Sequence, residues 1–250
     1  MSNKLSVVQV ADINPGGGNS WPQAFTEYRG ELYFSAAEPE EERELYKVAR
    51  DGTVSLVADI NPGNGGSFPQ DFINSRGELY FTAFEPETGS ELYKVTQDGT
   101  VTLLDINPGG GYSIPQGLTE YYGELYFTPF VPETGQELYK VARDGTVTLV
   151  ADINPEGVHS VPFGFTESRS ELYFAATEPE TGREIYKVAR DGTVTLVADI
   201  NPGNGSSGPS GFTEYRGDLY FSAGEPETGQ ELYKVTQDGT VTGHTDWCFG

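Results

Sequence analysis

Residues 152–202 read DINPEGVHSVPFGFTESRSELYFAATEPETGREIYKVARDGTVTLVADINP, and this stretch decides the fold. After the DINP motif come four short runs rich in Tyr, Phe, Val and Thr, a composition typical of β-strands. These runs are PFGFTES, ELYFAAT, REIYKVA and TVTLVAD. Turn signals at Arg169-Ser170 and Asp191-Gly192 join the first run to the second and the third to the fourth. The stretch therefore predicts one antiparallel sheet of four strands.

The same unit occurs five times along the chain. Its DINP motif begins at Asp12, Asp59, Asp105, Asp152 and Asp199, which gives steps of 47, 46, 47 and 47 residues. Self-similarity at such a period is typical of propellers and solenoids. The second run of each unit is apolar on both faces, so neighbouring sheets must cover both. We expect an all-β fold, a five-bladed β-propeller of four-stranded antiparallel blades, forming a single domain over residues 1–250.

The two ends of the chain compete for one strand position in the last blade. Residues 6–12, SVVQVAD, align with the fourth run TVSLVAD at 53–59, and so do residues 240–246, TVTGHTD. Gly243 and His244 interrupt the apolar pattern of the second candidate. We therefore expect the N-terminal strand, about residues 5–12, to close the ring, because closure removes exposed sheet edges. The tail at 243–250, with Trp247, would then leave the sheet and support weak self-association.

Charge and cysteine content exclude several classes of partner and scaffold. The chain has 15 basic and 38 acidic residues, a net charge of −23, which disfavours nucleic acid and anionic lipid surfaces. A single cysteine, Cys248, excludes an intrachain disulfide. Neither a signal-peptide pattern nor a transmembrane run is present, so we expect a soluble chain without membrane insertion. The compartment is not predicted.

Three motifs carry a resemblance to a known group of proteins. DINPGxGxSxP, GELYFxA and GxELYKxxxDGT resemble the bacterial ELWxxDGT-repeat (hyalin-like) proteins over residues 5 to about 242. Tyr replaces the Trp of that pattern in every copy, and four residues rather than two precede Asp-Gly-Thr. The resemblance implies a repetitive propeller and supplies no catalytic residues. By blade count the chain is also similar to tachylectin-type five-bladed lectins.

The loops after the second and fourth strands should share one face, and the copies differ most there. A serine is constant in the DINPG loops while its neighbours vary, as loops that recognise a ligand do. The candidate ligand-binding residues are Asn19, Trp21, Phe68, Asp71, Tyr112, Ile114 and His159. Aromatic rings suit the C–H face of a sugar, so the pattern favours a non-catalytic, multivalent, lectin-like module that binds a glycan or a protein surface through the DINPG and EPETG loops.

Three alternatives stay open. One is a structural or assembly scaffold that contacts another protein, and another is an idealised repeat without a ligand. The third is a five-bladed glycoside hydrolase, for which Asp71 is the best single candidate. His159 and His244 have no nucleophile signature nearby.

No cofactor is expected, and Ca²⁺ is a weak alternative. The weak metal candidates are Asp12, Asp59, Asp105, Asp152 and Asp199. The first of these loops departs from a calcium loop because Ile13 and Pro15 fill spacer positions and Gln23 stands at the twelfth.

Overall fold

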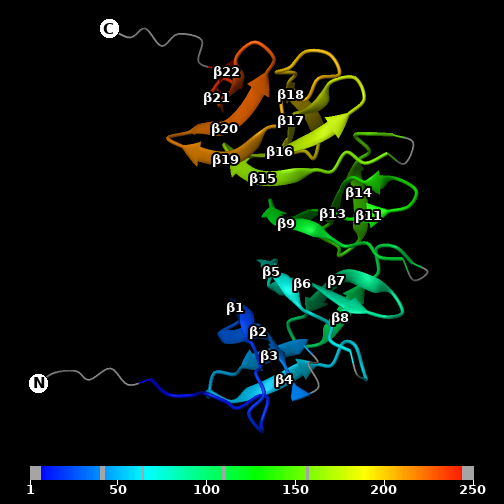
Figure 1. The fold of residues 1–250 in the computed structure, drawn as a ribbon, viewed down its shortest axis with the longest axis vertical. Helices are drawn as coiled ribbons and strands as arrows, with labels where there is room; N and C mark the ends of the chain where they lie inside the picture. The colour runs from blue at the N-terminus through cyan, green and yellow to red at the C-terminus, as the bar shows by residue number, and fades with distance from the viewer. Residues whose placement is uncertain (1–6, 40–42, 64, 109–110, 156–157, 244–250) are drawn as a thin grey trace, which may run out of the picture. The chain divides into compact units, whose positions relative to one another are not determined.

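The computed structural model describes residues 7–39, 43–63, 65–108, 111–155 and 158–243. These residues form 22 β-strands and no α-helix (Figure 1). The all-β prediction is confirmed. None of the described residues forms a helix of the length and apolarity that crossing a membrane requires.

Five antiparallel sheets of four strands follow one another along the chain. The first contains β1 (Gln23–Tyr28), β2 (Glu31–Ala37), β3 (Arg43–Val48) and β4 (Val54–Ala58). The second contains β5 (Gln70–Ser75), β6 (Glu78–Glu85), β7 (Gly89–Val95) and β8 (Val101–Leu104). The third contains β9 (Gln116–Tyr121), β10 (Glu124–Thr128), β13 (Leu138–Val141) and β14 (Val147–Ala151). The fourth contains β15 (Phe163–Ser168), β16 (Glu171–Glu178), β17 (Gly182–Val188) and β18 (Val194–Ala198). The fifth contains β19 (Ser210–Tyr215), β20 (Asp218–Glu225), β21 (Gly229–Val235) and β22 (Val241–Gly243).

A sixth, two-stranded sheet pairs β11 (Phe130–Val131) with β12 (Gly135–Gln136). It continues the hairpin of the third repeat beyond Pro129. In the second repeat the equivalent residue, Ala83, pairs with Glu91 inside an unbroken ladder. Proline has no N–H to donate, so the ladder is interrupted there.

Left-handed backbone conformations make the tight turns and the bulges. In the first hairpin Arg29 and Gly30 have φ values of 54° and 76°, as a type I′ turn requires. The first strand of a repeat also changes register, for example between Gln70 and Ile73. Asp71 lies at that bulge with a φ of 55°, where the last three repeats have glycine.

The chain divides into two compact units, Met1–Ile114 and Pro115–Gly250. In the first unit Tyr33 and Leu45 of one sheet pack with Leu79 and Phe81 of the next. In the second unit two such cores form, one between the third and fourth sheets and one between the fourth and fifth. Neighbouring sheets therefore cover the second strands, as their apolar pattern predicts.

The predicted closing strand was wrong. Residues 7–12 form no strand, and Val7 is 99% exposed. The fourth strand of the fifth sheet is β22, which pairs Val241 with Val235 and Gly243 with Tyr233. Gly243 fits because a Cβ there would lie 2.5 Å from Cε1 of Tyr233, so the tyrosine ring fills the space of a side chain. The tail that carries Trp247 lies outside the described residues.

Candidate binding site at the DINPG and EPETG loops

A buried glutamate from the third strand of a repeat fixes the DINPG loop that follows. The carboxylate of Glu44 accepts hydrogen bonds from Ile60 N at 3.0 Å, Ser67 N at 2.8 Å and Ser67 Oγ at 2.6 Å. Glu91, Glu137 and Glu184 accept the same three bonds from their own loops. We call this arrangement the glutamate clasp. It explains why a serine is constant in the loops.

Burial opposes the charge of these carboxylates. Desolvation raises the pKa of Glu91 to about 7, against the lowering effect of the hydrogen bonds from Ser113 and Ile106. Burial also raises the pKa of Glu44, Glu137 and Glu184. The clasp was missed in the sequence, although a glutamate that recurs before Leu-Tyr or Ile-Tyr in the third run of each repeat is a signal for it.

The asparagine of the DINP motif closes its own loop in the first, second, fourth and fifth repeats. Asn14 Nδ2 donates to the Asn19 carbonyl at 3.2 Å and to the Glu38 carbonyl at 3.1 Å, which links a DINPG loop to an EPETG loop. Asp199 Oδ2 accepts from Gly203 N at 3.3 Å. Among the described residues no three His, Cys, Asp or Glu side chains form a group that could hold a metal ion. Calcium binding by the DINP aspartates therefore stays a prediction.

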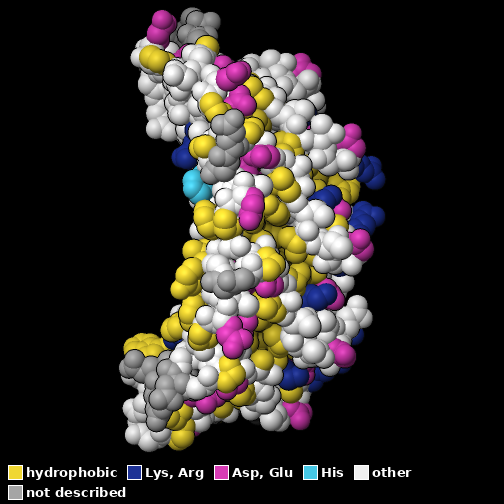
Figure 2. Space-filling view, turned by 90° about the vertical axis from the view of Figure 1, so that its right-hand side faces the viewer, with side chains coloured by type: hydrophobic (Ala, Val, Ile, Leu, Met, Phe, Trp, Pro, Cys, Tyr) yellow, Lys and Arg dark blue, Asp and Glu magenta, His cyan; other side chains and the backbone are white. Residues whose placement is uncertain are grey.

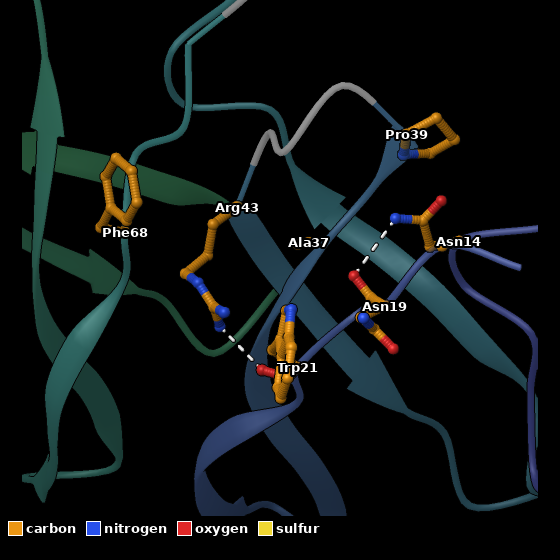
Figure 3. A pocket seen from close by; sticks show the side chains of 8 residues that line it. Asn14, Asn19, Trp21, Ala37, Pro39, Arg43 and Phe68 are labelled. Carbon is orange, nitrogen blue, oxygen red and sulfur yellow. Dashed lines mark hydrogen bonds between the residues drawn. The ribbon is translucent and has the colours of Figure 1, made fainter.

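A pocket of the first unit lies between these two loops (Figure 3). It has a volume of about 660 Å³ and is lined by Asn14, Gly18, Asn19, Trp21, Ala37, Pro39, Arg43 and Phe68. Trp21 is 66% exposed and Phe68 is 55% exposed. Both residues precede a proline and have a left-handed backbone, with φ values of 42° and 51°. Bulky residues rarely adopt this conformation, and such strain is common at binding sites.

Arg43 brings a positive charge into the pocket. Its side chain projects between Phe68 and Trp21 in Figure 3, and its Nη1 donates to the Trp21 carbonyl at 2.9 Å. The hydrogen bonds of Arg43 to described residues all start from Nη1, while a guanidinium has five N–H donors. Partial burial lowers the pKa of Arg43, which nevertheless stays charged at neutral pH.

Small side chains keep this pocket open. In the second repeat the residue equivalent to Ala37 is Phe84, whose ring stacks on Tyr112 at 6.3 Å. In the third repeat Phe130 stacks on His159 at 5.7 Å. The fourth repeat has Thr177 at this position, and a similar pocket of about 480 Å³ opens beside Asn154 and Pro179. A small residue at this position thus accompanies the pockets of the first and fourth repeats, and a phenylalanine ring occupies the position in the second and third.

The structure brings together only part of the predicted site. Asn19, Trp21 and Phe68 line the same pocket, whereas Tyr112 is stacked on a phenylalanine. His159 is stacked too, and its Nδ1 accepts a hydrogen bond from Gln136 N at 3.0 Å.

Ile114 and Asp71 lie elsewhere. Ile114 is exposed, with a left-handed backbone like that of Trp21. Asp71 accepts a hydrogen bond from Thr82 Oγ1 at 3.2 Å at the strand bulge. Aspartate tolerates a left-handed backbone, which explains this residue without a catalytic role.

Carboxylates of the EPETG loops bond locally. Glu85 accepts from Thr88 Oγ1 at 2.8 Å, and Glu178 accepts from Thr181 Oγ1 at 2.9 Å. Glu38 and Glu225 accept from Tyr46 and Tyr233. Acidic side chains are interspersed with hydrophobic ones over the visible face of each unit in Figure 2. These glutamates therefore stabilise the loops in which they occur.

No protein family matches the chain, and no curated protein matches it. Several solved structures are similar. A structure from a study of two prolyl endopeptidases has a TM-score of 0.57 at 14% identity, and the match covers 90% of this chain and 36% of that one. A puromycin-hydrolysing peptidase of Mycobacterium tuberculosis has a TM-score of 0.53 at 12% identity, with 92% and 38% covered. A puromycin hydrolase has a TM-score of 0.49 at 20% identity, with 96% and 41% covered.

The similarities to the first two structures show the fold alone, a β-propeller type, and the chain spans well under half the length of all three proteins. The prediction of a non-catalytic, multivalent lectin was wrong. Similar structures include one from a study of two prolyl endopeptidases and a puromycin-hydrolysing peptidase, and aromatic stacks fill the second and third of the repeated loop positions.

Proposed function

We propose that the chain is a peptide-recognition propeller that serves a hydrolase, with its binding site in the pocket between Trp21, Arg43 and Phe68. The five four-stranded sheets are then five propeller blades. The likeness to a prolyl endopeptidase and a peptidase, over 90% and 92% of this chain, supports a role with peptide substrates.

The pocket carries the proposal because its lining matches the chemistry of a peptide. Two exposed aromatic rings offer an apolar surface for a proline or aromatic side chain. Nε and Nη2 of Arg43 make no hydrogen bond to a described residue, and these donors suit a carboxylate, either an acidic side chain or a C-terminus. Asn14 and Asn19 supply amide groups for the peptide backbone.

The net charge of the protein limits which peptides fit. A charge of −23 repels an acidic peptide at long range, although salt screens this beyond about 8 Å. Contact with Arg43 acts at much shorter range. The peptide should therefore carry one carboxylate for Arg43 and no further net negative charge.

Binding to an array of immobilised peptides, followed by titration of the best sequence with a fluorescent label, tests this proposal. Trp21→Ala and Ala37→Phe should each weaken the affinity at least tenfold, about 1.4 kcal/mol, since one removes a wall and the other fills the pocket. Arg43→Gln should weaken binding of peptides with the carboxylate and leave amidated peptides unchanged.

A matched control is available in the fourth repeat. Thr177→Phe fills the equivalent pocket of the second unit and should leave the affinity of the Trp21 site unchanged. An array without bound peptides, or equal affinities for Ala37→Phe and the unmodified chain, would contradict the proposal.

A further inference from the structure

The glutamate clasp consists of a glutamate acceptor and three loop donors. The first repeat has donors without a described acceptor, and the fifth repeat has an exposed acceptor. Four glutamates are at most 2% exposed, namely Glu44, Glu91, Glu137 and Glu184. The fifth, Glu231, is exposed. Its neighbour Leu232 is 61% exposed, whereas the equivalent Leu45, Leu92, Leu138 and Ile185 are 0% exposed. The fifth sheet therefore presents the acceptor half of the clasp to solvent.

The same sheet exposes further residues that other sheets bury. Tyr28 OH donates to the Gly77 carbonyl of the next sheet at 2.7 Å, and Tyr121 OH donates to Ser170 in the same way. Their equivalent Tyr215 is 54% exposed, against 5% and 1% for those two. A cavity of about 310 Å³ lies beside Leu232, Tyr233 and Gly243. We call this surface the tail face.

The first repeat carries the donor half. Ile13 N, Ser20 N and Ser20 Oγ are equivalent to the three donors that bind Glu44, and no described carboxylate accepts from them. The loop already has the bound shape. Its Asn14–Asn19 bond of 3.2 Å matches the Asn61–Gly66 bond of 3.3 Å, and Ala37 N donates to the Ser20 carbonyl at 2.7 Å as Phe84 N does to Ser67 at 2.8 Å.

Apolar residues beside this loop are also uncovered. Leu32 is 37% exposed, whereas Leu79, Leu125, Leu172 and Leu219 are 0% exposed. Phe25 is exposed as well. We call the Ile13–Ser20 loop together with Leu32 and Phe25 the head face. Where two sheets of one unit meet, the residues equivalent to Leu32 and Phe25 pack against the preceding sheet.

We propose that the tail face of one chain binds the head face of a second copy. Glu231 would accept from Ile13 N, Ser20 N and Ser20 Oγ of the second copy, Leu232 would pack on its Leu32, and Tyr215 OH would donate to its Gly30 carbonyl. The contact repeats, residue for residue, the junctions within each unit. Each face is exposed on the unit that carries it, the head face on the first and the tail face on the second, and a second copy supplies the complement of each.

Such an interface is heterologous, because two different surfaces meet. It can therefore add further copies in the same direction. Each chain carries a charge of −23, so repulsion opposes association, and added salt should strengthen it.

Sedimentation of the full chain and of two blocked variants tests the proposal. Leu232→Glu blocks the tail face, and Ser20→Glu places a carboxylate against Glu231 and blocks the head face. The unmodified chain should rise above its monomer mass of 27.2 kDa as its concentration increases. Each blocked variant alone should stay monomeric. An equimolar mixture should double the mass and go no further, because only one intact head and one intact tail remain in each pair.

Leu196→Glu is the matched control, since Leu196 is an exposed leucine on β18 outside both faces. It should associate like the unmodified chain. A mixture of the blocked variants that stays monomeric would overturn the proposal. So would an unmodified chain that is monomeric at every concentration while both blocked variants melt at a lower temperature, because that result means the chain binds its own loop.

Discussion

The inner and outer sides of the DINPG loops differ in what their residues contact. On the inner side Ser67, Ser113, Ser160 and Ser207 bind a buried glutamate, with Oγ to carboxylate distances of 2.6 Å each. On the outer side the residue after the serine is Trp21, Phe68, Ile114, Val161 or Gly208. Two of these outer residues, Trp21 and Phe68, line a pocket.

The difference separates residues that the fold needs from residues that are free to vary. A buried carboxylate without hydrogen-bond donors lowers the stability of the fold, so each of the four clasps must retain its glutamate and its serine. The outer side carries no such constraint. In these repeats recurrence therefore marks stability, and variation marks the surface on which a site can form.

Removal of one clasp should have the largest effect. Glu91→Ala leaves Ile106 N, Ser113 N and Ser113 Oγ without an acceptor in a buried position. We expect the free energy of unfolding to fall by roughly 3 kcal/mol, measured by denaturation in urea.

Glu231→Ala is the paired control for the comparison. The same residue type at the same position of the repeat is exposed there. In dilute protein its removal should change the free energy of unfolding by no more than about 0.5 kcal/mol. If both variants lost the same free energy of unfolding, burial in the clasp would not be the reason that the glutamate stabilises the protein.

The pH dependence of stability should sharpen the comparison further. Burial raises the pKa of Glu91 from 4.5 to about 7, so the native state holds this proton more tightly than the unfolded chain does. The contribution of Glu91 to the free energy of unfolding should be highest below pH 4.5 and should fall as the pH rises to about 7. The expected change is a few kcal/mol.

Urea unfolding at a series of pH values measures this trend. Glu91→Gln keeps a carbonyl acceptor but cannot ionise, so its stability should depend less on pH than that of the unmodified chain. A variant with the same slope would show that other groups cause the dependence.

The repeat period and the turn residues were enough to predict the strands. Asp-Gly, Arg-Gly and the alternating apolar runs each act locally, so their effect can be read from a short segment. Which of the two candidate segments forms the last strand is determined by contacts between residues that are distant in the sequence. Gly243 interrupts the apolar pattern of β22, but the ring of Tyr233 fills the space above that glycine. Such a contact depends on the three-dimensional structure and cannot be predicted from a short segment.

Only some of the predicted site residues lie together. Variation in the loops predicted a site that includes Asn19, Trp21 and Phe68, and these three residues line one pocket. It did not show that Phe84 and Phe130 cover Tyr112 and His159, because those rings come from strands β6 and β11 and not from the DINPG loops. Arg43 was missed because its equivalents are Ser90, Gln136, Arg183 and Gln230, a varied set inside a strand.

Apart from the Glu231 control, backbone strain on the outer side should give the smallest effect. Val161 has a φ of 47°, although β-branched residues disfavour this region, and the equivalent residue of the last loop is Gly208, with a φ of 60°. Glycine adopts this conformation without a steric cost, and Val161 N would still donate to the Gln136 carbonyl. Val161→Gly should therefore raise the free energy of unfolding by about 0.5–1 kcal/mol, measured in urea. Gly208→Val should lower it by at least as much, since it introduces the same strain. Destabilisation by Val161→Gly would mean that the side chains of the outer loop contribute packing, and the division between the two sides of the loop would then fail.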